Sequence, residues 1–238
     1  METAKGCDAS LLLDSTANNT AEKAAVPNLS LAGFDVIDEV KSQLEQTCPG
    51  VVSCADILAL AARDSVSFQF NRSMWEVLTG RRDGTISRIS EALANIPSPF
   101  FNFTTLKQSF ANKSLTVHDL VVLSGKNDAD PSLNATYAAF LKTKCLSLSD
   151  NTTTVEMDPG SSLSFDAHYY SNLKLSQGLF QSDAALLTDG GASNIVTELL
   201  NTTKFFTEFA QSMKRMGAIE VLTGTAGEIR KKCNLVNS

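Results

Sequence analysis

The sequence predicts an all-α fold. Apolar residues recur at three- and four-residue steps, helix-capping signatures precede several of these stretches, and runs that alternate apolar and polar residues are scarce. The chain has 238 residues, of which 43% are hydrophobic, so it can bury a core as one large domain or as two lobes around a ligand. We expect helices throughout, with at most a short β ribbon.

The first long helix is predicted from one apolar stripe. Its members are Phe34, Ile37, Val40, Leu44 and Cys48. Pro49 and Gly50 end this helix, because proline cannot continue it and glycine favours a turn. The next helix is predicted to begin at Ser53, since Asp56 follows three residues later with capping-box spacing.

Two more helices are predicted in the second half of the chain. Thr116 and Asp119 repeat the capping-box spacing ahead of a short apolar run, with Gly125 as the residue that ends the helix. A later helix is predicted from an apolar stripe that ends at Gly217. The stripe consists of Phe205, Phe209, Met213 and Met216. The Ser-, Asn- and Pro-rich stretches 95–105 and 146–164 are predicted to be loops.

Charge and hydropathy exclude two classes of partner. The formal net charge is −6, and no basic cluster exceeds Arg230–Lys232, so we expect no nucleic-acid binding. The longest apolar runs, such as Ile57–Ala62, are far shorter than the roughly 20 residues that span a bilayer. We therefore expect no membrane span, and Met1–Lys5 has no apolar region that would indicate a signal peptide.

Glycosylation sequons suggest that, despite the missing signal peptide, the chain is of a secreted type. Eight Asn-x-Ser/Thr sequences occur, at Asn18, Asn28, Asn71, Asn102, Asn112, Asn134, Asn151 and Asn201. They are typical of a surface that passes through a secretory pathway, although a chain rich in asparagine and threonine also makes sequons by chance. The five cysteines are an odd number for a secreted disulfide framework, and five unrelated cytosolic thiols remain an alternative.

Several motifs occur in a recognisable order along the chain. They are Gly6–Asp14, Glu22–Lys23, Pro27–Leu31, Gly33–Ile37, Cys48–Asp64, Trp75–Gly84, Ile96–Phe100, Asp119–Gly125, Phe165–Tyr170, Gly178–Asp183 and Gly224–Arg230. Together they resemble the secreted haem peroxidases of plants, the class III peroxidase family, over nearly the whole chain. The resemblance implies a haem-peroxidase-like, two-lobed helical fold, here incomplete, in which residues 1–238 form a single truncated domain.

The resemblance also implies a function. Relatives of this type are extracellular or cell-wall monomers that oxidise small phenolic donors with hydrogen peroxide, using haem b and two calcium ions. The reaction needs an imidazole on iron, a second imidazole to move the peroxide proton and an arginine to stabilise charge.

The catalytic residues of the family have no counterpart in this chain. The last two of those groups precede the motif at Gly6 in the family, where this chain has only five residues. The iron ligand follows the Leu–Ser–Gly run, where this chain reads Lys126, Asn127 and Asp128. We expect this form to be inactive or severely impaired as an enzyme, as a gene-model or splicing product or an unusual natural variant. A non-enzymatic pseudo-peroxidase binding glycoprotein is the alternative.

Supporting residues of the family are still matched. Asn28 matches the residue that orients the distal histidine, Pro97 the proline at the donor-access edge, and Asp183 the carboxylate that holds the proximal histidine. Asp183 is therefore expected to be a buried carboxylate that must take up a proton or a water molecule. The two histidines, His118 and His168, match no ligand position, so we expect a solvated first-turn position and a surface position.

The resemblance further implies metal ligands. The distal calcium site would use Gly6, Asp8, Ser10 and Glu22, and the proximal site would use Asp158, Ser161, Ser164 and Asp166. Both sites lack ligands that the family supplies elsewhere, and ordinary turn chemistry is the alternative interpretation of these residues.

Finally, the resemblance implies one disulfide and one ion pair. Cys54 would pair with Cys233, while the family partners of Cys7, Cys48 and Cys145 are missing. Arg81 and Asp56 match a buried ion pair beside the disulfide, and Asp56 could also serve as a helix cap.

Overall fold

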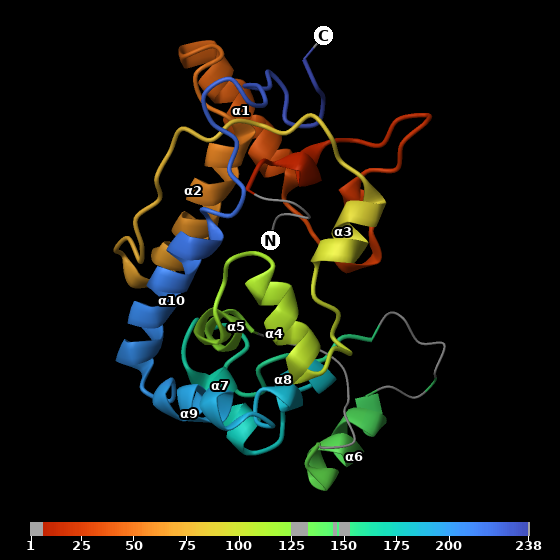
Figure 1. The fold of residues 1–238 in the computed structure, drawn as a ribbon, viewed down its shortest axis with the longest axis vertical. Coiled ribbons are helices and arrows are strands. Elements are labelled where there is room, and N and C mark those ends of the chain that lie inside the picture. Colours follow the sequence, from red (N-terminus) through yellow and green to blue (C-terminus); the bar gives the residue numbers. More distant parts are fainter. Residues whose placement is uncertain (1–6, 125–132, 145–146, 148–152, 238) are drawn as a thin grey trace. The chain divides into compact units, whose positions relative to one another are not determined.

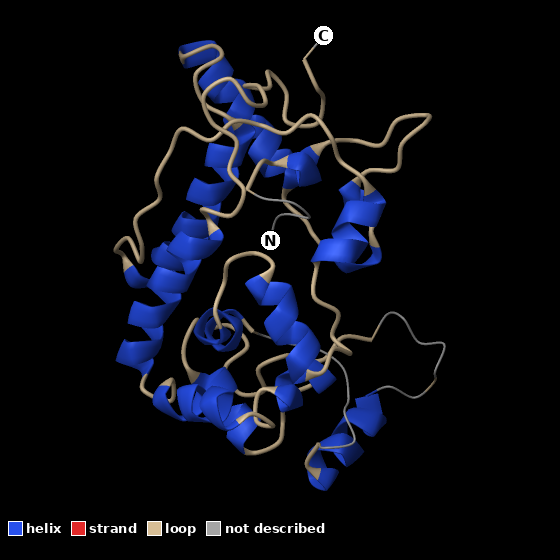
Figure 2. Ribbon diagram, viewed as in Figure 1, coloured by secondary structure: helices blue, strands red, loops and turns tan. Residues whose placement is uncertain are grey.

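The structure is a computed structural model that describes residues 7–124, 133–144, 147 and 153–237. In these residues all regular secondary structure is helical, and Figure 2 shows helices joined by loops. The all-α prediction is confirmed. The predicted ribbon is reduced to isolated β-bridges, among them Arg82 with Leu222 and Asp83 with Glu228.

The chain divides into two compact units. The first unit contains the residues up to Ile96 together with those from Lys214 onward, and the second contains Pro97–Met213. In the described part of the chain, no helix is both long enough and apolar enough to cross a bilayer.

The first unit is built on two long helices and several short ones (Figure 1). These are η1 (Ser10–Leu12), η2 (Glu22–Ala24), η3 (Val26–Asn28), α1 (Phe34–Thr47), α2 (Cys54–Ser67), η4 (Phe68–Phe70) and α3 (Ile89–Asn95). A small core joins the start of the chain, α2 and the C-terminal segment. It contains Ala9, Leu12, Cys54, Ala55 and Cys233.

Helix α1 only partly follows the predicted stripe. Phe34 and Ile37 pack against the core, but Val40 is 39% exposed and Lys41 is 1% exposed. The Lys41 ammonium donates hydrogen bonds to Glu45 Oε1 and to a backbone carbonyl, each at 2.6 Å. A lysine can replace an apolar residue on this face because its methylene stem packs while its ammonium finds oxygen acceptors.

The capping signatures behave differently in the two places. Ser53 accepts a hydrogen bond from the Asp56 backbone N–H at 3.0 Å, as predicted for the start of α2. In a capping box the Asp56 carboxylate would also accept a hydrogen bond from the Ser53 backbone N–H. In the described part of the chain, it accepts instead from the Gly80 N–H at 2.6 Å and from Arg81, so the capping box of α2 is only half formed. Thr116 and Asp119 do form both bonds of a capping box, and Gly125 lies outside the described residues.

The second unit contains the remaining helices. They are α4 (Phe103–Ala111), α5 (Val117–Leu123), α6 (Ala135–Lys144), α7 (His168–Lys174), α8 (Gln181–Ala185), α9 (Gly190–Glu198) and most of α10 (Thr202–Met216). The predicted stripe of α10 is confirmed: Phe205 and Met213 are buried, and Phe209 packs against the core. Phe165 packs against this stripe, with its ring centroid 4.7 Å from that of Phe209 in an edge-to-face arrangement.

Candidate functional site

His118 lies in the first turn of α5. Its Nε2 is 3.7 Å from Oε2 of Glu208 on α10, and its side chain is 31% exposed. The predicted first-turn position is therefore correct, and the structure adds a carboxylate neighbour.

His168 begins α7 and faces a loop. Its Nδ1 lies 2.9 Å from Oδ1 of Asp158, and its backbone N–H donates to Oδ1 of Asp166 at 2.8 Å. The side chain is 38% exposed, which agrees with the predicted surface position. Both histidines of the chain thus contact acidic side chains, and neither contacts Asp183.

Asp183 is buried, with 2% of its surface exposed. Its Oδ1 accepts a hydrogen bond from the Tyr169 hydroxyl at 2.7 Å, and its Oδ2 accepts from the Phe180 backbone N–H at 3.0 Å. The expected burial of this carboxylate is confirmed, and the structure adds a hydrogen-bond donor that the sequence did not indicate, a tyrosine on α7. Burial raises the pKa of Tyr169 well above its usual value, and the neighbouring charge of Asp183 raises it further.

The carboxylates assigned to a proximal calcium ion make hydrogen bonds within the protein. Asp158 Oδ1 accepts from Asn172 Nδ2 at 2.7 Å as well as facing His168, and Asp166 accepts from the Ser161 hydroxyl. Ser164 N–H donates to the carbonyl of Ser161 at 3.1 Å in a local turn. The structure brings these residues into one loop, where they form a hydrogen-bonded cluster.

The residues assigned to a distal calcium ion are less closely joined. Asp8 Oδ1 accepts from the Ser10 N–H at 3.0 Å, which is ordinary turn chemistry. Glu22 is buried, with its N–H bonded to the Ser87 hydroxyl at 3.0 Å. Gly6 lies outside the described residues. Among the residues that the structure describes, no group of three or more His, Cys, Asp or Glu is placed to hold a metal ion.

Two other remnant residues have structural partners or positions. Asn28 is buried, and its Nδ2 donates to the Glu22 carbonyl at 2.9 Å. Pro97 is half-buried and begins the second unit. The stretch in which the family resemblance places the iron ligand, residues 126–128, lies outside the described residues.

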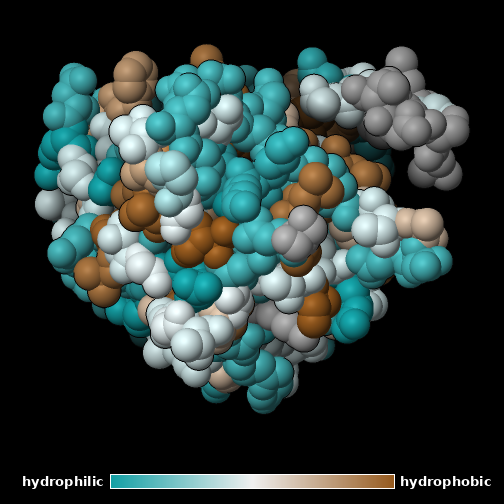
Figure 3. All heavy atoms as spheres, turned by 90° about the horizontal axis from the view of Figure 1, so that it is seen from above, coloured by the Kyte–Doolittle hydropathy of each residue, from teal (hydrophilic) through white to brown (hydrophobic). Residues whose placement is uncertain are grey.

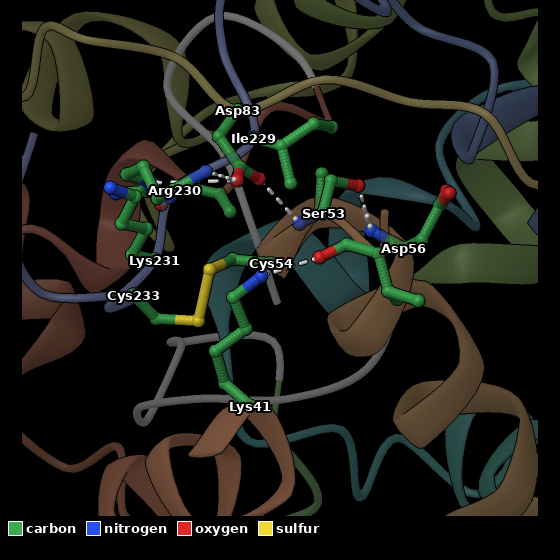
Figure 4. The surroundings of a disulfide bond; sticks show 12 residues. Lys41, Ser53, Cys54, Asp56, Asp83, Ile229, Arg230, Lys231 and Cys233 are labelled. Atoms are coloured by element: carbon green, nitrogen blue, oxygen red, sulfur yellow. Dashed lines mark hydrogen bonds and ion pairs between the residues drawn. A yellow bond between two sulfur atoms is a disulfide. The ribbon is translucent and has the colours of Figure 1, made fainter. Parts of the chain in front are cut away.

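A buried polar cluster surrounds a disulfide (Figure 4). Cys54 and Cys233 are bonded, with their Cα atoms 5.7 Å apart, as the family resemblance implied. Asp83 and Arg230 lie beside the bridge, and both are fully buried. Asp83 accepts from the Ala55 and Arg230 backbone N–H groups, each at 2.8 Å. Burial raises the pKa of Asp83, and the bonds from Arg230 oppose that rise.

The predicted ion pair is also formed next to this cluster. Arg81 Nη1 lies 3.1 Å from Asp56 Oδ1, and both side chains are buried. Arg81 Nη2 donates to the Gly217 carbonyl at 2.7 Å. This bond connects Arg81 to the residue that directly follows α10. The Asp56, Arg81, Asp83 and Arg230 side chains all form hydrogen bonds with protein atoms, as expected of a cluster that supports the fold.

The contacts of four residues were not predicted from the sequence, namely those of Lys41, Tyr169, Asp83 and Arg230. Lys41 has a local signal, since Ile37, Lys41 and Glu45 follow one another at four-residue steps. Tyr169 as the partner of Asp183 has none, because the two residues are 14 positions apart on separate helices. The contact between Asp83 and Arg230 spans 147 positions.

Comparison with known proteins agrees with this architecture. A family model described as peroxidase matches residues 2–202. The chain is 49% identical to Peroxidase 24 of Arabidopsis thaliana, over 98% of this chain and 74% of that protein. It is 48% identical to Peroxidase 3 of Arabidopsis thaliana, with 98% and 78% covered. It is 47% identical to Peroxidase 1 of Oryza sativa subsp. japonica, with 98% and 79% covered.

The match to Peroxidase 24 extends over 260 residues, whereas this chain has 238. Peroxidase 24 therefore contains residues inside the matched region that this chain lacks. Together with the extent of the family match and the identity to three peroxidases, the helical fold and its disulfide show that this chain belongs to the peroxidase family of plants.

Proposed function

We propose that this chain is a non-catalytic member of the peroxidase family. Its relatives would oxidise phenolic donors with hydrogen peroxide, with haem b and calcium as cofactors, and this form would not turn over. The proposal rests mainly on the contacts of both imidazoles, since His118 lies beside Glu208 and His168 lies beside Asp158. A haem peroxidase depends on an imidazole that holds the iron.

The state of Asp183 supports the same conclusion. In a metal site, a carboxylate behind a ligating histidine orients the ring and strengthens its bond to the metal. Here Asp183 receives the Tyr169 hydroxyl instead, so the carboxylate would have no imidazole to orient. The extra residues inside the matched region of Peroxidase 24 agree with a segment missing from this chain.

Hemin titration tests the proposal. The purified chain is mixed with hemin, the Soret band is followed, and the oxidation of a phenolic donor is measured with hydrogen peroxide. Hemin alone is the negative control, and a complete peroxidase of the family is the positive control. We expect a spectrum and a rate close to those of hemin alone. Donor oxidation well above the hemin rate would contradict the proposal.

A binding role is the second candidate, and one observation favours it. A pocket of about 440 Å³ lies between α1 and the C-terminal segment of the first unit, lined in part by Lys41, Glu45 and Lys231. Small-molecule sites have volumes of roughly 300–1,000 Å³, so the pocket could hold a small polar ligand. Calorimetric titration with small charged and aromatic compounds would discriminate, because a binding protein retains ligand affinity without peroxide-dependent turnover.

The location of the relatives extends to this chain as part of the proposal. The sequons and the formed disulfide agree with an extracellular or cell-wall protein, since disulfides persist in oxidising compartments. Fractionation of the tissue that expresses the chain, with mass spectrometry of the wall fraction, tests this placement. Recovery of the chain only from the cytosol would contradict it.

A further inference from the structure

Three sequon asparagines have the same structural role. Asn102, Asn134 and Asn201 each immediately precede a helix, namely α4, α6 and α10. The side-chain oxygen of each accepts a hydrogen bond from the backbone N–H three residues later, at 3.0, 3.2 and 3.0 Å respectively. Asparagine is among the preferred residues at this position because its oxygen satisfies an otherwise unpaired N–H of the first turn.

The cap fixes the direction of each side-chain amide. Because Oδ1 is directed at the helix N-terminus, Nδ2 is directed away from that backbone. All three residues are exposed, and within the described part of the chain none of the three Nδ2 atoms donates a hydrogen bond. The oxygen that the helix needs and the nitrogen that an N-linked glycan needs are therefore different atoms of one amide, and both can be used at once.

Asn28 shows the opposite arrangement. It is 7% exposed, and its Nδ2 donates to the Glu22 carbonyl at 2.9 Å. A sugar on that nitrogen would remove the hydrogen bond and would have no room in the buried site. The sequon at Asn28 is thus incompatible with a glycan in the folded chain, although its sequence is as suitable as the others.

We propose that Asn102, Asn134 and Asn201 are N-glycosylation sites that also cap their helices, and that Asn28 carries no glycan in the folded protein. The donor is a polyprenyl-pyrophosphate-linked oligosaccharide. A bond forms between Nδ2 and C1 of the first sugar, the bond from C1 to the pyrophosphate oxygen breaks, Nδ2 loses one proton, and the lipid pyrophosphate leaves. The proposal rests on the extracellular route proposed above.

The other exposed sequons lack the capping feature. Asn18, Asn71 and Asn112 are exposed, and the structure places none of them directly before an α-helix. Figure 3 shows that hydrophobic side chains on one face of the molecule form several small groups separated by hydrophilic ones. The proposal concerns the three caps alone.

Glycan mapping tests the proposal directly. The chain is produced in plant cells behind a secretion signal, digested with an N-glycosidase and mapped by peptide mass spectrometry, which detects an aspartate at each formerly occupied asparagine. Secreted protein and protein retained in the endoplasmic reticulum are both mapped, so that poor secretion does not prevent the measurement. We expect glycans at all three caps, and no glycan at Asn28 in the secreted fraction.

Matched variants separate the glycan from the cap. Thr104→Ala, Thr136→Ala and Thr203→Ala remove each sequon and leave the capping asparagine in place, so each should lower the mass of the chain by one glycan. Asn102→Asp removes the glycan but keeps an oxygen cap, so helix content should be unchanged. Ser30→Ala removes the sequon at Asn28 and should leave the number of glycans on the chain unchanged.

Two results would overturn the proposal. One is an unmodified cap asparagine in both the secreted and the retained protein, and the other is a glycan at Asn28 in the secreted protein. Neither result bears on catalysis, because the hemin titration uses protein made in bacteria without glycans. Failure of the glycan proposal is therefore distinguishable from failure of the proposed function.

Discussion

The disulfide between Cys54 and Cys233 provides the sharpest test of what stabilises the first unit. The two residues are 179 positions apart, so the bond closes a loop of most of the chain. In the chain-entropy model, a loop of this size lowers the entropy of the unfolded chain by about 18 cal/mol/K, which is about 5 kcal/mol at 25 °C. This equals a large part of the roughly 5–15 kcal/mol that stabilises a typical domain.

Alanine substitutions measure this contribution. Cys54→Ala, Cys233→Ala and the double variant are compared with the oxidised wild type by urea unfolding. Each single variant should lose about as much free energy of unfolding as the double, because opening the loop at either end removes the same constraint. Cys48→Ala is the matched control, since Cys48 is not part of a disulfide, and it should cost less than about 1 kcal/mol.

The outcome is read from the pattern as well as from the size of the loss. A loss below about 2 kcal/mol in the double variant, or single losses that add up to the double loss, would refute loop closure as the source. Non-reducing mass mapping should also find this bridge as the sole intramolecular one. A homogeneous second bridge among Cys7, Cys48 and Cys145 would contradict the inference that their partners are missing.

Two further predictions concern buried polar groups. Arg81→Met should cost about 3–5 kcal/mol, because it leaves the Asp56 carboxylate buried without its cation, and the double variant with Asp56→Leu should recover part of the loss; a single loss below about 1 kcal/mol in urea unfolding would contradict this. Burial raises the pKa of Tyr169 and Tyr170 above the usual value, and burial likewise raises that of Tyr137. Because the folded state favours the neutral phenols, their contribution to stability is complete below about pH 10 and is lost as the pH rises through the folded pKa values. Tyrosinate absorbance should therefore rise together with the loss of helical circular dichroism, and a gradual titration near pH 10 with helices intact would contradict the burial.

Local patterns in the sequence predicted the helices well, because their causes are local. The stripe of α10 has its predicted buried residues, and the Thr116–Asp119 capping box forms both bonds. The Asp56 prediction was only half right, since spacing cannot reveal that Gly80 and Arg81, 24 and 25 positions away, compete for its carboxylate. Hydrophobic periodicity predicted Val40 as a core residue, whereas the adjacent Lys41 occupies the buried position.

The candidate site was less predictable, because its partners come from distant segments. Family resemblance implied the disulfide and the Arg81–Asp56 pair, and both are formed. No pattern indicated that the Tyr169 hydroxyl would satisfy Asp183, since that contact depends on how α7 packs beside α8. The Asp183 carboxylate is therefore hydrogen-bonded within the folded chain, whereas the family resemblance implied that it would hold a histidine.

The stability of the whole chain depends on which cofactors it binds. Complete relatives of the family would gain stability from haem and two calcium ions that bind only the folded state. Each such ligand adds about 2.7 kcal/mol when its concentration is a hundredfold above Kd. This form is proposed not to turn over and to lack part of both cofactor sites, so we expect it to lack those contributions.

Large apolar side chains are also exposed. Leu163 is 94% exposed, Phe68 is 83% exposed and Val26 is 77% exposed. We therefore predict a chain that keeps its helical content but packs loosely, binds hydrophobic dyes and aggregates. Far-ultraviolet circular dichroism, dye fluorescence and light scattering measure these three properties on one sample.

Hydrogen exchange locates the part that should remain ordered. Protection should be greatest around Trp75, Arg81 and Cys54, because the disulfide and the fully buried Asp83–Arg230 cluster connect segments that are far apart in the sequence. The single tryptophan is 7% exposed in this unit, so its fluorescence should report a later unfolding step than the loss of helix in the second unit. A sharp cooperative melt, independent of calcium and with little dye binding, would contradict the prediction. It would mean that the scaffold is stable without its cofactors, which is what a selected binding protein requires.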